Sequence, residues 1–380
     1  MTWQILAVFS QPESLHNRKK FMKAAVCYEY GKPLVIEELD IAAPEAGEVK
    51  VKMTAAAICH SDVHIISGDW GTRLPLVPGH EGAGVVVEVG PEVDRVQVGD
   101  AVVVSLLREC GNCPGCAANA PHLCSGRFPM DTNGRLRNQN GDRILAGLNT
   151  GAFAEYVVVS QTQLVPYSVN MSAEAAALLA CGVITGVGAV NNSADVEAGK
   201  SVVVIGAGGV GLNSIQGAKL RGADPIIALD LQDAKADIAR DFGATHFVNA
   251  SADDVKKQIR RLTGGGADYT FVTVGSRAAA ELGYSLTGLR GTLTYVGIPD
   301  WKSTVPVPVG LTILAEKKIA GSFMGSTNLK DDVPMLIEQY SQGELKLDEL
   351  ITNRYSLEQI NEAIAGTKSG TVLRNVIMFE

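Results

Sequence analysis

A glycine loop near the middle of the chain constrains the fold most strongly. Residues 206–211 read Gly-Ala-Gly-Gly-Val-Gly, which is a G-x-G-x-x-G pattern. Because the chain holds 41 glycines, the pattern alone has many chances to arise by accident. Here, however, a short apolar segment at 200–205 precedes it, and a helical pattern running to residue 221 follows it. A glycine loop between a strand and a helix is typical of dinucleotide-binding folds.

The residues of this loop have distinct expected roles toward a dinucleotide. Gly206 permits the tight turn, Gly208 lets the backbone approach the pyrophosphate, and Gly211 lets the helix pack closely on the strand. Gly209 and Val210 open the helix, whose free N–H groups and partial positive charge attract phosphate. The sequence therefore predicts a cofactor site at this loop.

An acidic residue indicates which dinucleotide binds. Asp230 ends the next predicted strand, 24 residues after Gly206. A carboxylate at that place accepts hydrogen bonds from both ribose hydroxyls of the adenosine and repels a 2′-phosphate. The pattern therefore favours NAD over NADP. The alternative is a glycine-rich turn in an α/β domain that binds no nucleotide.

The apolar pattern divides the chain into two kinds of structure. Up to about residue 182, glycine and proline turns separate short apolar segments, and strands are predicted at 49–53, 83–89 and 101–104. We expect a β-rich, barrel-like domain there. Beyond it, predicted strands at 225–230, 246–248, 269–274 and 292–297 alternate with predicted helices at 233–242 and 254–262. That alternation predicts a parallel sheet with helices on both faces. From about residue 321, helices at 332–340 and 357–364 lead to a last strand at 374–379.

Length and charge exclude several function classes. A chain of 380 residues has room for two domains. A net charge of -8 without a basic stripe is untypical of proteins that bind nucleic acid, and no apolar run approaches the length needed to span a membrane. In residues 1–21 an apolar stretch precedes a basic cluster, which is the reverse of a secretory signal. We expect 1–21 to be a disordered extension of a cytoplasmic protein.

Four of the seven cysteines lie within 15 residues of one another. The motif is C-x2-C-x2-C-x7-C, and its members are Cys110, Cys113, Cys116 and Cys124. In a chain without a secretory signal, clustered cysteines are more often metal ligands than disulfides. Four thiolates suit tetrahedral zinc, and a site with four protein ligands is structural because no position stays open for substrate. The motif therefore predicts one structural zinc.

Three further metal-ligand side chains are scattered along the chain. Cys59 opens the segment Cys-His-Ser-Asp-Val-His, His80 lies in Gly-His-Glu-Gly, and Cys181 precedes the change to alternating strands and helices. Sequence spacing alone does not unite them. Taken singly, each is more often a core residue than a ligand, because a buried cysteine usually packs as a small hydrophobe.

Taken together, these motifs resemble those of the zinc-containing alcohol dehydrogenases of the medium-chain dehydrogenase/reductase superfamily. The resemblance covers residues 22–379 and includes the Cys59 segment, the Gly-His-Glu element 21 residues later, the four-cysteine motif, and the glycine loop with Asp230. It implies an α/β fold in which a GroES-like β-rich catalytic domain, 22–182 and 322–380, joins a Rossmann domain with a doubly wound parallel sheet, 183–321. The active site would lie in the cleft between them.

The resemblance also implies the roles of the catalytic residues. Cys59, His80 and Cys181 would hold a catalytic zinc, with the alcohol in the fourth position and its hydride passing to the nicotinamide. Ser61 would take the alcohol proton, which then passes through the nicotinamide ribose to His64. By the same resemblance, Asp62 would support the ligand histidine and Glu81 would lie behind the zinc. Ordinary loop polarity is the alternative for Ser61, Asp62 and His64.

Further residues match cofactor and substrate positions of that family. His60 and Arg374 would contact the pyrophosphate, Lys235 the ribose beside Asp230, and Thr185 and Val210 the back of the nicotinamide ring. Many relatives carry arginine at the His60 position, so we expect weaker hold on NAD here. Trp70 and Leu106 would line the substrate pocket, with plain core packing as the alternative.

We therefore predict a zinc-containing, NAD-dependent alcohol dehydrogenase with two Zn2+ per chain, which forms an aldehyde or ketone. One alternative is a thiol-dependent formaldehyde dehydrogenase of the same fold, although the arginine and acidic residues that would mark a glutathione adduct are not found. Another is a non-catalytic zinc and nucleotide-binding protein. A homo-oligomer is expected, and the length of 124–181, between that of tetrameric and dimeric relatives, leaves dimer and tetramer open.

Overall fold

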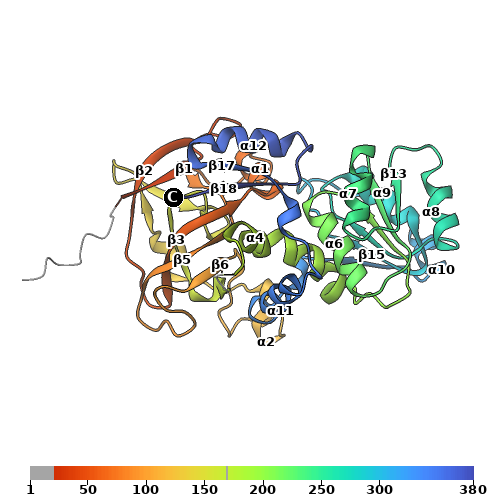
Figure 1. Ribbon diagram of the computed structural model, residues 1–380, viewed down its shortest axis with the longest axis horizontal. Helices are drawn as coiled ribbons and strands as arrows, with labels where there is room; N and C mark the ends of the chain where they lie inside the picture. The colour runs from red at the N-terminus through yellow and green to blue at the C-terminus, as the bar shows by residue number, and fades with distance from the viewer. Residues whose placement is uncertain (1–20, 168–169) are drawn as a thin grey trace, which may run out of the picture.

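The computed structural model describes residues 21–167 and 170–380. Figure 1 shows two lobes, a β-rich lobe that holds the C-terminus and a second lobe of alternating strands and helices. The expected extension, 1–21, lies outside the described residues except for Phe21, which opens strand β1 (Phe21–Val26).

Two sheets form the β-rich lobe. The larger one has the strand order β10-β6-β5-β3-β18-β17, and β9 also pairs with β3. Its strands are β3 (Glu48–Ala57), β5 (Glu81–Val89), β6 (Ala101–Val104), β9 (Tyr156–Ser160), β10 (Leu164–Pro166), β17 (Ile351–Ser356) and β18 (Arg374–Met378). The smaller sheet, β1-β2-β7-β8-β4, adds β2 (Val35–Ile41), β4 (Leu76–Val77), β7 (Leu136–Arg137) and β8 (Arg143–Ala146). The last strand, β18, pairs antiparallel with β3, so the end of the chain returns to the first lobe.

A six-stranded parallel sheet forms the second lobe, in the order β13-β12-β11-β14-β15-β16. Its strands are β11 (Val202–Ile205), β12 (Ile226–Asp230), β13 (His246–Asn249), β14 (Ala267–Val272), β15 (Thr287–Tyr295) and β16 (Lys318–Gly321). The strand order reverses between β11 and β14, and ligands of doubly wound sheets bind at that point, beyond the carboxyl ends of the strands.

Helices cover both faces of this sheet, as expected from the sequence. Alternate residues of β11 belong to different core clusters: Val202 and Val204 pack with α6 (Gly209–Leu220) and α7 (Ala236–Asp241), whereas Val203 and Ile205 pack with α8 (Val255–Thr263) and α9 (Arg277–Leu286). Such two-sided burial is why parallel strands are apolar throughout. The expected strands and helices are present, although β15 begins at Thr287, earlier than expected, and β16 and α9 were not foreseen.

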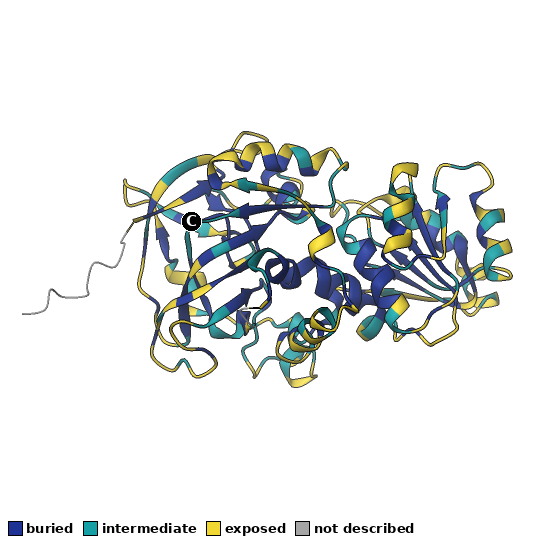
Figure 2. Ribbon diagram, in the orientation of Figure 1, coloured by how far each residue is buried: buried dark blue, intermediate teal, exposed yellow. Residues whose placement is uncertain are grey.

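A buried helical segment, Ala173–Ser193, connects the two lobes (Figure 2). It consists of α4 (Ala173–Leu178), the π-helical turn η4 (Leu179–Val183), α5 (Ile184–Gly188) and a second π-helical turn, η5 (Ala189–Ser193). By length and composition it could cross a membrane, so the expectation of no such stretch was wrong. However, 89% of its most apolar window is buried inside the protein, as in a core helix. The expected domain boundary between 182 and 183 falls inside this segment, and it stays a prediction.

Candidate active site

Four potential metal ligands from three separate elements meet at the junction of the lobes. Cys59 caps the start of α1 (His60–Ser67), Glu81 begins β5 with His80 directly before it, and Cys181 belongs to the π-helical turn η4. Their ligand atoms all lie within 4.8 Å of one another. The His80 Nε2 atom is 3.3 Å from the Cys181 sulfur, and all four side chains are buried. The fold thus brings together residues that sequence spacing did not unite.

Asp62 fixes the positions of Cys59 and His80 through hydrogen bonds. Its carboxylate accepts hydrogen bonds from the Cys59 N–H at 3.1 Å and the Gly79 N–H at 3.0 Å, and it pairs with His80 Nδ1 at 2.9 Å. The side chains of Asp62 and His80 are fully buried. A carboxylate on one ring nitrogen fixes the imidazole orientation and leaves Nε2 directed at the cluster.

The electrostatics of the cluster favour a cation. A hydrogen bond from Cys181, followed by the influence of His80, holds the pKa of Cys59 well below its usual range. The same hydrogen bond and burial raise the pKa of Cys181 well above its usual range. Burial opposes protonation of His80, but the charge and hydrogen bond of Asp62 raise the pKa of His80 well above its usual value. Two sulfurs and one imidazole this close suit tetrahedral zinc, whose ligand atoms stand roughly 3.8 Å apart.

Glu81 and Arg374 form a buried ion pair beside this cluster. Burial raises the pKa of Glu81 to about 7, although the charge of Arg374 opposes the rise. Arg374 also lies against the glycine loop, because a Cβ added at Gly209 would come within 2.8 Å of its Cδ atom. Among the described residues, Arg374 Nε and Glu81 Oε1 are buried without a hydrogen-bond partner. An unpaired guanidinium N–H against the glycine loop fits a phosphate ligand.

The glycine loop has the geometry expected of a dinucleotide site. Gly206 has a φ of +102°, which only glycine adopts readily. A Cβ on Gly211 would come within 1.7 Å of the Gly206 carbonyl oxygen, so close packing requires glycine there. A Cβ on Gly208, in contrast, would meet nothing within 4 Å, so the backbone before α6 borders open space. These features fit a pyrophosphate at the start of α6.

Asp230 lies beside this loop. Its carboxylate accepts a hydrogen bond from the Ala207 N–H at 2.8 Å and pairs with Lys235 Nζ at 3.2 Å. The side chain of Asp230 is 10% exposed and that of Lys235 17% exposed. Both residues expected to contact the adenosine ribose are therefore neighbours next to the pyrophosphate loop.

Of the two residues expected behind the nicotinamide, Thr185 lies beside the metal cluster. Thr185 follows Cys181 by one helical turn, and their side chains are 4.0 Å apart. The Met324 sulfur is 3.7 Å from both the Cys181 sulfur and the Thr185 hydroxyl. Val210 is partly buried at the start of α6 and packs against the core cluster that contains Cys181.

Helix α1 carries the expected proton-relay residues. The Ser61 hydroxyl is 3.7 Å from the Cys59 sulfur. One turn further on, His64 Nδ1 pairs with Asp69 at 2.8 Å, and the His64 ring stacks on Trp70 with centroids 5.3 Å apart. At the helix start, packing around the His60 ring lowers the pKa of His60, although the charge of Cys59 opposes this, so the neutral ring predominates near pH 7.

The two expected pocket residues differ in their packing. Trp70 is partly buried against the core of the β-rich lobe. Leu106 is partly buried against the cluster that includes Cys59 and Cys181. No described contact joins the two side chains, and pocket lining stays a prediction for both.

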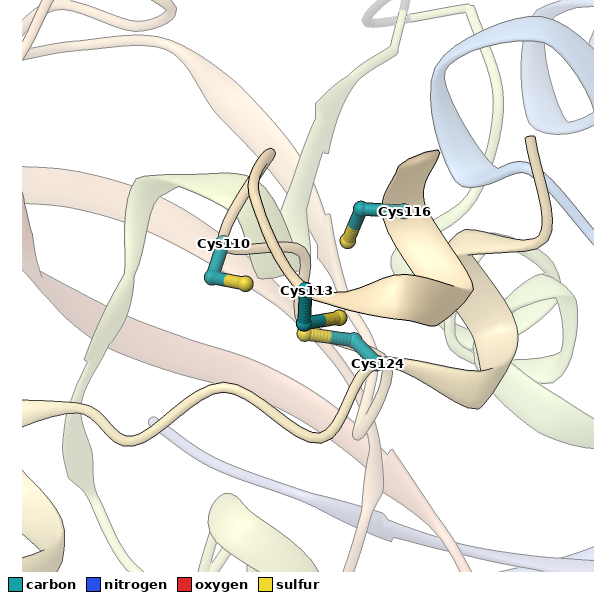
Figure 3. A group of neighbouring side chains, drawn as sticks. All are labelled: Cys110, Cys113, Cys116 and Cys124. Atoms are coloured by element: carbon teal, nitrogen blue, oxygen red, sulfur yellow. The ribbon is translucent and has the colours of Figure 1, made fainter. Parts of the chain in front are cut away.

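The four-cysteine motif forms a second possible metal site, which shares no residue with the cluster of Cys59, His80, Glu81 and Cys181. Figure 3 shows the sulfur atoms turned toward a common centre, and all four lie within 4.8 Å of one another as free cysteines. The Ser125 N–H donates to the Cys113 sulfur and the Gly126 N–H to the Cys124 sulfur, each at 3.4 Å. Backbone donors lower the pKa of Cys113 to about 5, whereas burial raises the pKa of Cys124 to about 12. Zinc would stabilise all four as thiolates, so the cluster fits a structural ion.

Two residues of the site were not foreseen. Asp69 gave no signal beyond its place five residues after His64, and an exposed acidic side chain is ordinary after a helix. Met324 lies 143 residues from Cys181 in the sequence, and only the return of the chain through η7 (Met324–Ser326) brings it near.

Comparison with known proteins identifies the family. Residues 45–169 match the model of the alcohol dehydrogenase GroES-like domain, and residues 209–342 match that of the zinc-binding dehydrogenase. A curated relative, the NDMA-dependent alcohol dehydrogenase of Amycolatopsis methanolica, is 40% identical over 94% of this chain and 98% of its own length. This chain belongs to the zinc-dependent alcohol dehydrogenases.

Other members of the family support the same conclusion. The S-(hydroxymethyl)glutathione dehydrogenase of a Synechocystis strain is 36% identical over 94% of this chain and 99% of its own length. The solved structure of benzyl alcohol dehydrogenase from Acinetobacter calcoaceticus superposes with a TM-score of 0.89 at 32% identity, covering 95% of this chain and all of that one. The predicted family, the GroES-like plus Rossmann fold and the zinc-dependent oxidoreduction of alcohols are confirmed. The protein is an enzyme that uses zinc and a nucleotide on small molecules.

Proposed function

We propose that this alcohol dehydrogenase uses NAD as its hydride acceptor. The observation that carries the proposal is Asp230, held beside the glycine loop by the Ala207 N–H and Lys235. Its charge would repel the 2′-phosphate of NADP, whereas its free lone pairs would accept ribose hydroxyls. His60 and Arg374 would contact the pyrophosphate, the latter through the unpaired Nε atom.

The catalytic roles follow from the contacts around the first metal cluster. Zinc held by Cys59, His80 and Cys181 would supply Lewis acidity to the alcohol oxygen, and the nicotinamide would take the hydride. Ser61, beside the Cys59 sulfur, would accept the alcohol proton at its Oγ atom. Asp69 pairs with the Nδ1 atom of His64. The Nε2 atom of His64 would therefore be free to receive that proton, one helical turn beyond Ser61. Asp62 and Glu81 would act through their neighbours, the first on His80 and the second on Arg374.

Thr185 and Val210 would set the position of the nicotinamide ring. Thr185 is buried beside Cys181, and Val210 opens α6 directly after the glycines. These two side chains would hold the nicotinamide, which supplies the hydride acceptor when it is bound. We also propose the domain limits given above, 22–182 with 322–380 and 183–321, supported by the pairing of β18 with β3.

We further propose a homo-oligomer formed through the outer edge of the parallel sheet. β16 is the terminal strand of that sheet. The surface around it carries apolar side chains that are at least 60% exposed: Leu289, Val309, Leu311, Ile313 and Leu314. An open strand edge beside such a surface is suited to a second copy of the same chain. A Leu314→Glu variant should therefore have a lower mass by light scattering, and an unchanged mass would reject this face. A cytoplasmic location stays part of the proposal.

The test is NADH formation from primary, secondary and aromatic alcohols, with NAD and NADP compared in parallel. Turnover with NAD that is at least about tenfold faster than with NADP supports the proposal. Equal rates would reject the role of Asp230. Since one relative is NDMA-dependent, a third arm adds NDMA. Turnover only in that arm would show that free NAD is not the terminal acceptor.

A second candidate function is oxidation of a thiol adduct of formaldehyde. The 36% identical S-(hydroxymethyl)glutathione dehydrogenase favours it. Formaldehyde with glutathione is therefore included as a substrate pair. Faster turnover of that pair than of every simple alcohol would replace the first proposal with this one.

A further inference from the structure

We propose that Trp301 is a specificity-determining residue that, with Trp70, forms an aromatic wall selecting alcohols with a planar aromatic group. The proposal rests on the alcohol dehydrogenase function given above and names its substrate class. The chain contains three tryptophans, and Trp70 and Trp301 contact each other although 231 residues separate them in the sequence.

The contact joins the two lobes at the active site. The ring centroids of Trp70 and Trp301 are 5.9 Å apart at an interplanar angle of 46°. Trp70 also stacks on His64, with ring centroids 5.3 Å apart and an interplanar angle of 20°. Three rings thus run from the proton-relay helix α1, which Cys59 caps, to the Rossmann lobe.

The place of Trp301 in the fold is that of a ligand-contacting residue. It lies six residues beyond the end of β15 at Tyr295, at the carboxyl edge of the parallel sheet. The glycine loop follows β11 at the same edge, which is where doubly wound sheets bind ligands. A side chain there can reach a substrate that lies between the nicotinamide and α1.

Exposure and hydrogen bonding indicate that this wall is incomplete without a ligand. Trp301 is 67% exposed, which is high for so large an apolar side chain. Among the described residues, the Trp70 Nε1 donor is buried and has no hydrogen-bond partner. Leu106 is partly buried against the core cluster that contains Cys59 and Cys181. An aromatic substrate would cover the exposed indole of Trp301, whereas ethanol is too small to do so.

The test compares benzyl alcohol with ethanol in the wild type and in Trp301→Ala. Offset or edge-to-face aromatic contacts predict a roughly three- to tenfold fall in kcat/KM for benzyl alcohol, mostly through KM. The value for ethanol should change less than about twofold, because ethanol does not reach the wall. Trp301→Phe should recover most of the preference, since it retains an aromatic face. Val98→Ala, at a residue that is 60% exposed, is the control for surface substitutions.

Equal changes for both alcohols in Trp301→Ala would overturn the proposal, because a structural defect acts on both. An unchanged benzyl alcohol value would overturn it as well. If the wild type oxidises neither alcohol with any acceptor, the proposed function itself fails. The NAD dissociation constant of Trp301→Ala, measured by fluorescence, should equal that of the wild type, and a weaker value would assign Trp301 to the cofactor instead.

Discussion

Replacing Asp62 by Asn should weaken the catalytic zinc site without changing any zinc ligand. Asp62 is fully buried and accepts hydrogen bonds from the Cys59 N–H and Gly79 N–H while it pairs with His80 Nδ1. Asparagine keeps the shape but offers one acceptor atom where the carboxylate has two. In either orientation of the amide, its NH2 group faces at least one of these donors.

The magnitude follows from the bonds that would be lost. In the better orientation the amide oxygen serves Gly79 and His80, and only the Cys59 N–H is left unpaired. One buried, unsatisfied donor costs about 1–3 kcal/mol of folding stability. Loss of the carboxylate behind a ligand histidine typically lowers metal affinity by about 10–100-fold. We therefore expect both effects in Asp62→Asn.

The assay is competition for zinc with a chelator of known affinity, together with urea unfolding. Asp253→Asn, which changes an exposed carboxylate in the same way, is the matched control and should match the wild type. Zinc affinity of Asp62→Asn within threefold of the wild type would refute the reasoning, because the carboxylate would then not support the ligand histidine.

Three further predictions concern the cofactor contact at His60, the four-cysteine cluster and the partly exposed carboxylate of Asp268. His60→Arg should lower the NAD dissociation constant by roughly tenfold, since a permanent cation replaces a weakly charged ring. Titration calorimetry measures this constant, and a value equal to that of the wild type would contradict the prediction. Cys113→Ser should release one zinc per chain and lower the melting temperature, checked by elemental analysis and calorimetry; full zinc content would contradict it. Burial opposes ionisation of Asp268, but bonds from Ser201 hold the pKa of Asp268 below its usual value. Its stabilisation is therefore present above the unfolded-state pKa and lost as the pH falls through the folded-state pKa. Asp268→Asn should cost at most about 1 kcal/mol near pH 7 and less below pH 4 in urea unfolding, and a loss that grows on acidification would contradict it.

Local pattern was sufficient for much of the fold. Strands such as β6 and β11 are short apolar segments between turn residues, and the glycine loop needs its glycines for reasons that lie within six residues. The four-cysteine motif was equally readable, because all of its ligands come from one loop. These features were predictable since the chemistry that defines them is local in the sequence.

The remainder of the site depends on long-range contacts that no local pattern encodes. Cys181 reaches Cys59 and His80 only because the helical segment between the lobes carries it there, so resemblance rather than spacing linked them. Met324 and Trp301 arrive through the carboxyl edge of the parallel sheet. The earlier start of β15 has the same origin, since its first residue, Thr287, pairs with Ala267 of a neighbouring strand.

Zinc content and NADH formation, measured on the same samples of the wild type and Cys181→Ser, test the central claim most directly. Cys27→Ala, which alters a buried cysteine outside both clusters, is the control. The wild type and the control should hold two zinc ions per chain and oxidise an alcohol with NAD. Cys181→Ser should hold one ion and have lost turnover. One zinc per chain in the wild type, or undiminished turnover in Cys181→Ser, would contradict the assignment of Cys59, His80 and Cys181 as the catalytic metal site.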